Sequence, residues 1–216
     1  MKALLCAMDI EYRNCIKYFP EGQEHAIDRI CVIYCSEKYN ILIAKTGVGK
    51  DAAYKCTEYI NNHFDIELFC SYGIAGAFSQ DINVGDIIIS ELVWEKLTSG
   101  VSLAYYSMHS LEKYNILFKI NSIKQAISIH VGSVLCNNNF VMDKTEKELL
   151  YADFKSLCVE MESAGIAKKC SELGMEFICI KIISDASDKK AIRSIILEQD
   201  SITDNLGRIL YTVFCQ

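Results

Sequence analysis

The sequence predicts an α/β protein: a three-layer αβα sandwich with helices on both faces of a central mixed, largely parallel sheet. Short apolar runs of strand length alternate with helix-like stretches along all 216 residues. Several of these runs are apolar without interruption, which is typical of strands that are covered on both faces. The chain has one proline and no low-complexity stretch, so we expect a single domain over residues 1–216 without a linker.

In the first half of the chain, five apolar runs predict strands and one stretch predicts a helix. The helix begins at Lys50, directly after a glycine-containing turn, and continues to His63. The second and third strands lie on either side of the turn-like segment SEKYN. The predicted strands are Ala3–Met8, Arg29–Cys35, Asn40–Thr46, Ile66–Gly73 and Asp86–Val93.

The second half of the chain continues the alternation. The run at Phe177–Ser184 (FICIKIIS) is the most apolar strand of the chain. The helix before it is expected to end at Gly174, because glycine is favoured just past the last helical residue. The other predicted strands are Ser128–Leu135 and Phe154–Met161, and the other predicted helices are Leu111–Ala126, Lys144–Tyr151 and Ser194–Phe214.

The composition excludes several classes of function. A formal charge of −6 does not favour a broad basic surface for nucleic acid. No apolar stretch approaches the roughly 20 residues of a membrane span, and the opening MKALLCAMDIEY is too short for a signal peptide, so we expect a cytoplasmic protein. The eleven cysteines have no C-x-x-C spacing and are interpreted as buried, reduced thiols. The four histidines form no metal-ligand pattern, and no metal or cofactor is expected.

Suggestive polar and small residues follow four of the predicted strands. In open α/β sheets, ligands bind outside the carboxyl ends of the strands. The sequence therefore predicts a small-molecule site where these ends meet. The four segments are Met8-Asp9-Ile10-Glu11, Gly73-Ile74-Ala75-Gly76, Glu160-Met161-Glu162 and Ser184-Asp185.

Two glycine-containing turns are candidate binding loops. The turn Gly47-Val48-Gly49 follows a strand and opens a helix, so its backbone N–H groups are available to an anion. It matches the dinucleotide fingerprint G-x-G-x-x-A, but no acidic residue ends a strand about 20 residues further on, and it is not a Walker A loop. The small residues of Gly73–Gly76 allow a ligand to approach the backbone closely. For both turns, a purely structural turn is the alternative.

The carboxylates at the strand ends have a chemical interpretation and a structural one. Glu160 and Glu162 lie two residues apart, on one side of the chain if it is extended, and a carboxylate can accept two hydrogen bonds from a vicinal diol. Asp185 closes a buried strand, where an acid can donate a proton. The alternatives are glutamates in the first turn of a helix, and an N-cap or Asx turn formed by Ser184 or Asp185. Glu11 alone is weak evidence, because most such glutamates are solvated.

Taken together, these segments resemble the nucleoside phosphorylase/hydrolase superfamily, and within it the 5′-methylthioadenosine/S-adenosylhomocysteine nucleosidases. The matching segments span nearly the whole chain in collinear order. Among them, V-E-M-E and I-S-D together form the signature that is specific to the family. The matching strings are AMDIE at 7–11, TGVGK at 46–50, YGIAGAF at 72–78, VGDIIIS at 84–90, NNFVMDK at 138–144, VEMESAGIA at 159–167 and IKIISDASD at 180–188.

The resemblance implies hydrolysis of the N-glycosidic bond of a purine nucleoside, releasing adenine and a ribose derivative, without a cofactor and in methionine salvage. Asp185 would deliver a proton toward N7 of the purine, and Glu11 would orient or deprotonate the attacking water. Glu162 would accept hydrogen bonds from the ribose hydroxyls and favour the cationic transition state.

The same resemblance implies the remaining substrate contacts. Phe140 would stack on the base, the backbone of Val141 would read its edge, Met161 would pack beneath the ribose, and Ser184 would hold Asp185. Family members are usually at least dimers, so a homodimer is expected. The other implied substrate-binding residues are Met8, Ile74, Ala75, Gly76 and Glu160.

The chain departs from the family pattern in several places. No Gly-Asp-Pro phosphate loop follows the first strand, which favours water over phosphate as the nucleophile. Ile74 stands where a serine or threonine is usual, and Lys181 replaces a common arginine. Residues 91–98 lack the usual aromatic-His-Asp stretch, which leaves the 5′ substituent open. The alternatives are a phosphate-dependent phosphorylase, a nucleoside-binding relative without turnover and, on the glycine turn alone, a dinucleotide-binding oxidoreductase.

Overall fold

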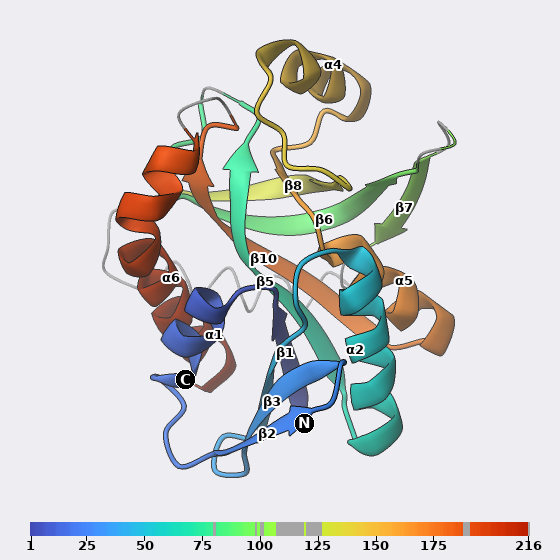
Figure 1. The fold of residues 1–216 in the computed structure, drawn as a ribbon, viewed down its shortest axis with the longest axis vertical. Coiled ribbons are helices and arrows are strands. Elements are labelled where there is room, and N and C mark those ends of the chain that lie inside the picture. The colour runs from blue at the N-terminus through green and yellow to red at the C-terminus, as the bar shows by residue number, and fades with distance from the viewer. Residues whose placement is uncertain are drawn as a thin grey trace.

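The computed structural model describes residues 1–79, 81–97, 99, 102–106, 119, 127–187 and 191–215. The order of its strands and helices follows the alternation that the sequence predicts (Figure 1). The strands are β1 Lys2–Cys6, β2 Gln23–Ile27, β3 Cys31–Ser36, β4 Ile41–Lys45, β5 Leu68–Ala77, β6 Ile87–Lys96, β7 Ser102–Tyr106, β8 Ile129–Cys136, β9 Cys158–Glu160 and β10 Glu176–Asp185. The helices are α1 Asp9–Ile16, α2 Lys50–His63, α4 Lys144–Phe154, α5 Ser163–Leu173 and α6 Ala191–Cys215.

Within the described residues, ten strands form one mixed sheet. Strands β4, β1, β5 and β10 lie side by side and parallel, so their carboxyl ends meet at one edge. The hairpin of β2 and β3 extends the sheet beyond β4 with antiparallel pairs. Strand β6 pairs with β10 in the antiparallel sense and with β8 in the parallel sense. The parallel edge is the place where an α/β sheet binds its ligand.

Five strands of this sheet close into a ring. Strand β5 pairs with β9, β9 with β8, β8 with β6, β6 with β10, and β10 pairs again with β5. The predicted α/β class and the mixed sheet are confirmed. A three-layer sandwich does not describe the whole molecule, because the ring gives half of the sheet a closed, barrel-like form. The short strand β9 makes the closure, and it carries Glu160 at its end.

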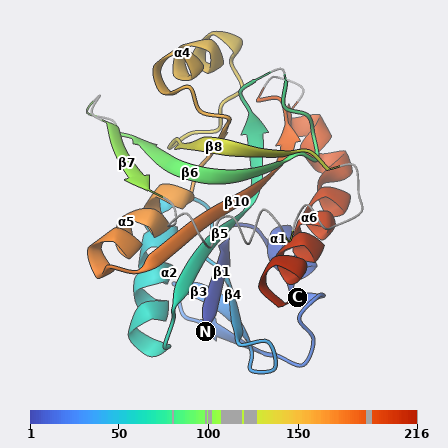
Figure 2. The same ribbon diagram turned by 180° about the vertical axis from the view of Figure 1, so that it is seen from behind.

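Two pairs of helices cover opposite faces of the central strands. Helices α1 and α6 pack together on one face, and α2 and α5 pack together on the other (Figures 1 and 2). The core is divided accordingly into two large buried clusters, because alternate residues of each strand face opposite sides. In β10, for example, Ile180 and Ile182 face the first pair of helices, and Cys179 and Ile183 face the second.

The predicted elements agree with the observed ones with few exceptions. Helix α2 has the predicted bounds, and Gly174, with φ +67°, ends α5 as expected. The segment Asp9–Ile16 is a helix and not the end of a strand, so Glu11 lies in the first turn of α1. Strands β2 and β7 were not predicted, and the predicted helix at 111–126 lies outside the described residues except for residue 119. No helix of the described chain has the length and apolar character to cross a membrane.

Candidate active site

A cavity of about 140 Å³ lies at the carboxyl ends of the parallel strands. Residues that follow β1 form one side, and the last residues of β5 and β10 form the floor. The junction between β9 and α5 forms the opposite side. The lining residues are Ala7, Met8, Glu11, Val48, Ile74, Ala75, Gly76, Phe140, Val159, Glu160, Met161, Glu162, Ser184 and Asp185.

Glu11 is buried at the start of α1 and is held by three backbone N–H groups. One carboxylate oxygen accepts hydrogen bonds from Ala7 at 3.1 Å and from the N-cap residue Met8 at 2.9 Å, and the other accepts from Ile74 at 2.9 Å. The hydrogen bond from the N–H of the N-cap residue Met8 to the side chain of Glu11, at position N3, is part of a capping box. Burial raises the pKa of Glu11, and the hydrogen bond from Ile74 opposes that rise. The carboxylate is therefore fixed and is a stronger base than an exposed glutamate.

Gly73 makes room for this carboxylate. Its φ of +147° is unfavourable for other residues, and a Cβ at this position would lie 2.5 Å from Oε1 of Glu11. The sequence predicted that the small residues of Gly73–Gly76 make room for a ligand. At Gly73, the space is occupied by the side chain of Glu11.

Glu162 is anchored from the other side of the cavity. It is the N-cap residue of α5, and its carboxylate accepts a hydrogen bond from the backbone N–H of Gly49 at 2.8 Å. Gly49, with φ +99°, opens helix α2. The glycine turn predicted to bind an anion thus donates to a carboxylate of the protein itself. Val48, at the tip of the turn, is 62% exposed and lines the cavity.

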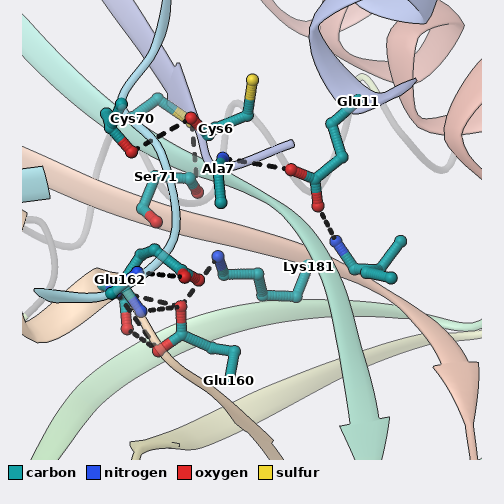
Figure 3. Close-up of polar contacts among 12 residues, drawn as sticks. Cys6, Ala7, Glu11, Cys70, Ser71, Glu160, Glu162 and Lys181 are labelled. Atoms are coloured by element: carbon teal, nitrogen blue, oxygen red, sulfur yellow. Dashed lines mark hydrogen bonds and ion pairs between the residues drawn. The ribbon is translucent and has the colours of Figure 1, made fainter. Parts of the chain in front are cut away.

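Glu160 points into the protein and is fully partnered. Its carboxylate accepts from the backbone N–H and the hydroxyl of Ser163, and from the backbone N–H of Glu162. It also forms an ion pair of 3.0 Å with the ammonium of Lys181, and both side chains are only 2% exposed (Figure 3). The two glutamates therefore have separate environments, although they lie two residues apart.

The pKa values of these two glutamates move in opposite directions. Burial, and then the negative charge of Glu160, raise the pKa of Glu162 to about 7. Burial also acts to raise the pKa of Glu160, but the charge of Lys181 and the hydrogen bonds from Ser163 outweigh it and hold that pKa below its usual value. Near neutral pH, Glu160 is ionised and Glu162 titrates.

Asp185 ends β10 at an irregularity in the sheet. The register between β10 and β5 shifts between Ile183 and Asp185, a bulge of the kind that redirects side chains next to active sites. One oxygen of Asp185 accepts from the hydroxyl of Ser184 at 2.6 Å, and the other accepts from the backbone N–H of Ser187 at 2.8 Å. Gly76 lies opposite, where a Cβ would collide with the hydroxyl of Ser187 and approach Asp185. The carboxyl group is thus fixed at the cavity wall.

The structure brings together most of the residues that the sequence singled out. Phe140 lines the cavity and is 43% exposed. Val141 is buried beside Phe78 and Leu150, and its side chain does not line the cavity. Six further residues that the sequence singled out also line the cavity: Met8, Ile74, Ala75, Gly76, Met161 and Ser184.

Sequence reasoning missed the groups behind the cavity. Lys181 was noted only as a replacement for arginine, but it is the ion-pair partner of Glu160. The available signal was a lysine inside the continuous apolar strand FICIKIIS, since a buried ammonium requires a carboxylate partner. The roles of Ser163 and Ser187 as donors to Glu160 and Asp185 gave no signal, because serine after an acidic residue is common at helix starts and turns. Within the described residues, no group of His, Cys, Asp and Glu has an arrangement that could hold a metal ion.

Comparisons with known proteins show the family and the fold to which the chain is similar. A family model described as the phosphorylase superfamily matches residues 2–214. The 5′-methylthioadenosine/S-adenosylhomocysteine nucleosidase of Buchnera aphidicola subsp. Acyrthosiphon pisum is 30% identical over 165 residues, which cover 72% of this chain and 71% of the relative. A solved structure of the nucleosidase of that name from Neisseria meningitidis, in complex with methylthio-immucillin-A, has a TM-score of 0.90 at 21% identity, covering 98% of this chain and 97% of the other. The futalosine hydrolase of Helicobacter pylori has a TM-score of 0.89 at 21% identity, covering 98% and 96%.

Proposed function

Because the chain belongs to the phosphorylase superfamily and, within it, to the 5′-methylthioadenosine/S-adenosylhomocysteine nucleosidase family, we propose that it hydrolyses the N-glycosidic bond of adenine nucleosides. The products are adenine and a ribose derivative. The substrates proposed first are 5′-methylthioadenosine and S-adenosylhomocysteine, which name the relatives.

One observation carries the proposal. Three carboxyl groups from distant parts of the chain, Glu11, Glu162 and Asp185, surround a single cavity, and each is held by hydrogen bonds from the protein. Cleavage of a glycosidic bond requires an acid for the departing base, a base for the water and negative charge near the sugar ring. A site that only bound a nucleoside would not need all three.

Asp185 is proposed to assist departure of the base. As the bond between the ribose C1′ and the purine nitrogen N9 breaks, its electron pair goes to the purine, and a proton from Asp185 at N7 lets the base leave as a neutral molecule. Ser184 and the backbone N–H of Ser187 hold the carboxyl group in place throughout. Proton transfer of this kind contributes roughly 10²–10⁴-fold to a rate.

Glu11 is proposed to activate the water. It takes one proton from the water as the oxygen bonds to C1′, so the products together contain the atoms of the nucleoside and one water molecule. The backbone donors Ala7, Met8 and Ile74 fix its orientation. Burial raises its pKa, which makes it better able to accept a proton.

Glu162 is proposed to bind the ribose hydroxyls and to stabilise the positive charge that develops on the sugar. Met8 and Met161 offer apolar surface for the sugar, and the exposed ring of Phe140 offers a face for the base. The backbone of Val141 remains the proposed contact to the base edge.

Water, and not phosphate, is the proposed nucleophile. A phosphate requires free donors, but the N–H of Gly49 at the start of α2 already donates to Glu162, and the N–H groups of Ala7 and Met8 already donate to Glu11. The turns that could hold an anion therefore hold the two carboxylates.

The test is release of free adenine by the purified protein. The substrate panel is 5′-methylthioadenosine, S-adenosylhomocysteine, 5′-deoxyadenosine and adenosine, with futalosine added because a futalosine hydrolase shares the fold. Each is assayed with and without phosphate, and the Asp185→Asn variant, purified in parallel, controls for contaminating activity. We expect phosphate-independent release. Absence of free base from every substrate would overturn the proposal, and dependence on phosphate would replace hydrolysis by phosphorolysis.

We also propose that residues 1–216 act as one domain and that two copies form a homodimer. Apolar side chains at the cavity support the second point, since the lining residues Val48 and Phe140 are 62% and 43% exposed. Exposed apolar side chains gathered in one region mark interaction surfaces. Light scattering on the eluting protein measures the mass, and a monomer at micromolar concentration would contradict the dimer.

A further inference from the structure

Lys181 stands out because it is a buried cation among carboxylates. It occupies the middle of β10, paired in register with Gly73 of β5 and Ile88 of β6, and its neighbours along the strand are apolar. On the face that Lys181 shares with Cys179 and Ile183, an apolar side chain would be the ordinary choice. An ammonium at such a position is unfavourable unless a buried anion compensates for it.

The compensation comes from the groups of the site. Lys181 pairs with Glu160 at 3.0 Å (Figure 3). It also interacts electrostatically with Glu162 and Glu11. Burial disfavours the ammonium, but the charge of Glu160 outweighs burial and keeps the pKa of Lys181 above its usual value. One fixed positive charge therefore lies behind three carboxyl groups that come from α1, β9 and the start of α5.

The other titratable groups around Lys181 are thiols. Burial raises the pKa of each of them, so they are neutral at physiological pH and do not compete with the carboxylates for the ammonium. These thiols are Cys6 of β1, Cys70 of β5, Cys158 of β9 and Cys179 of β10. Around Glu162, the remaining titratable neighbour is Cys136 of β8, whose pKa burial also raises.

The contacts of Glu160 connect Lys181 to the position of Glu162. Glu160 accepts from the backbone N–H of Glu162 and of Ser163, so it holds the turn that carries Glu162 into helix α5. Lys181 pairs with Oε2 of Glu160, the same oxygen that accepts from the backbone N–H of Glu162. The ion pair therefore adjoins the backbone that carries Glu162 and contributes two of the charges that act on its carboxyl group.

We propose that Lys181 is a positioning residue of the active site: through its ion pair with Glu160, it holds Glu162 in place and favours the ionised form of Glu162. The role in turnover rests on the proposed nucleosidase function. The role in the ionisation of Glu162 does not, so the two can be tested separately.

The first measurement does not require activity. Protein labelled with ¹³C at the glutamate carboxyl carbon is titrated by NMR, and the Glu162 signal is assigned by its loss in Glu162→Gln. In Lys181→Met, the titration of Glu162 should move to higher pH by about one unit or more, because a neighbouring positive charge is lost. In Lys181→Arg, which keeps the charge, it should stay near the wild-type value. An unchanged titration in a folded Lys181→Met protein would overturn the proposal.

The partner of the pair provides a test of opposite sign. Glu160→Gln removes a negative charge next to Glu162, so the titration of Glu162 should move to lower pH. The double variant Lys181→Met/Glu160→Gln removes both charges of the ion pair, so the titration of Glu162 should return toward the wild-type value. A shift of the same sign in both single variants would contradict a charge effect and indicate general disruption.

The second measurement uses turnover and a matched control. In the pH profile of kcat/KM, the limb on the low-pH side should shift in each variant by the same amount as the midpoint of the Glu162 titration measured by NMR. Lys169 is the control, because it is also a buried lysine and pairs with Glu58 at 2.9 Å and Glu172 at 3.0 Å, away from the cavity. Lys169→Met should lower stability without moving the limb. If wild-type protein releases no adenine, the nucleosidase function fails, and the NMR titration still decides the role of Lys181.

Discussion

Replacement of Glu162 by glutamine should make the folded protein more stable while it removes the activity. The carboxylate of Glu162 is held at the cavity by one hydrogen bond, from Gly49, next to the ionised Glu160. Glutamine has almost the same shape and can still accept that bond through its amide oxygen. The substitution therefore removes the charge and leaves the contact.

The size of the gain follows from the pKa. Burial and the charge of Glu160 raise the pKa of Glu162 from 4.5 to about 7. A difference of this size corresponds to about 3 kcal/mol between the two ionisation states. Below pH 4.5 the group is protonated in the folded and the unfolded chain and costs nothing. As the pH rises from 4.5 to 7, the unfolded chain ionises first and the folded wild type loses stability, and above pH 7 the loss is constant.

The assay is urea denaturation of wild type and Glu162→Gln at pH 5 and pH 8. We expect the variant to be more stable by up to about 3 kcal/mol at pH 8 and by clearly less at pH 5. The rate of adenine release should fall more than substrate affinity, because the charge matters most in the transition state. Glu160→Gln is the matched control two residues away: it leaves Lys181 buried without its partner and should be destabilised by about 3–5 kcal/mol.

Two results would refute this reasoning. If Glu162→Gln is no more stable than wild type at pH 8, ionisation of the Glu162 carboxyl group does not destabilise the folded protein. If the gain is the same at pH 5 and pH 8, it does not come from ionisation.

Three further predictions concern the wild type, the acid and one glycine. Between pH 8 and pH 6, kcat/KM of the wild type should fall about tenfold, because Glu162, with a pKa of about 7, takes up a proton. If kcat/KM does not change over this pH range, the ionised form of Glu162 is not essential. Asp185→Asn should lower kcat by about 10³-fold or more with an unchanged circular dichroism spectrum, and near-full activity would remove Asp185 from the mechanism. Gly73→Ala should lower both stability and activity, because the added Cβ would lie 2.5 Å from Oε1 of Glu11. Gly85→Ala is the control, since Gly85 also has a positive φ but no atom lies within 4 Å of the added Cβ, and it should lower stability alone. Equal losses of activity in the two variants would argue against a clash between Cβ and Glu11.

Much of the fold could be predicted because its strands are buried on both faces. Such strands are apolar along most of their length, and the runs at β1, β4, β5 and β10 show this in the sequence, with Lys181 of β10 as the notable exception. Helix α2 was predicted with its exact bounds because a glycine with positive φ precedes it. Helix α1 was missed, since it is short and buries the polar residues Glu11 and Asn14, which hides its amphipathic pattern.

The sequence singled out Glu11, Glu162 and Asp185, because each follows a predicted strand within a string that resembles the nucleosidase family. Only the tertiary structure could decide which partners these carboxyl groups have. The closure of β5, β9, β8, β6 and β10 into a ring depends on pairings between distant segments, and no local pattern encodes them. These pairings bring β10 and β9 into one ring, where Lys181 forms its ion pair with Glu160. Glu160 is therefore ionised, and its negative charge together with burial makes Glu162 titrate near neutral pH. Local sequence specifies which groups are present, and their separation in the folded chain fixes the charge each one carries.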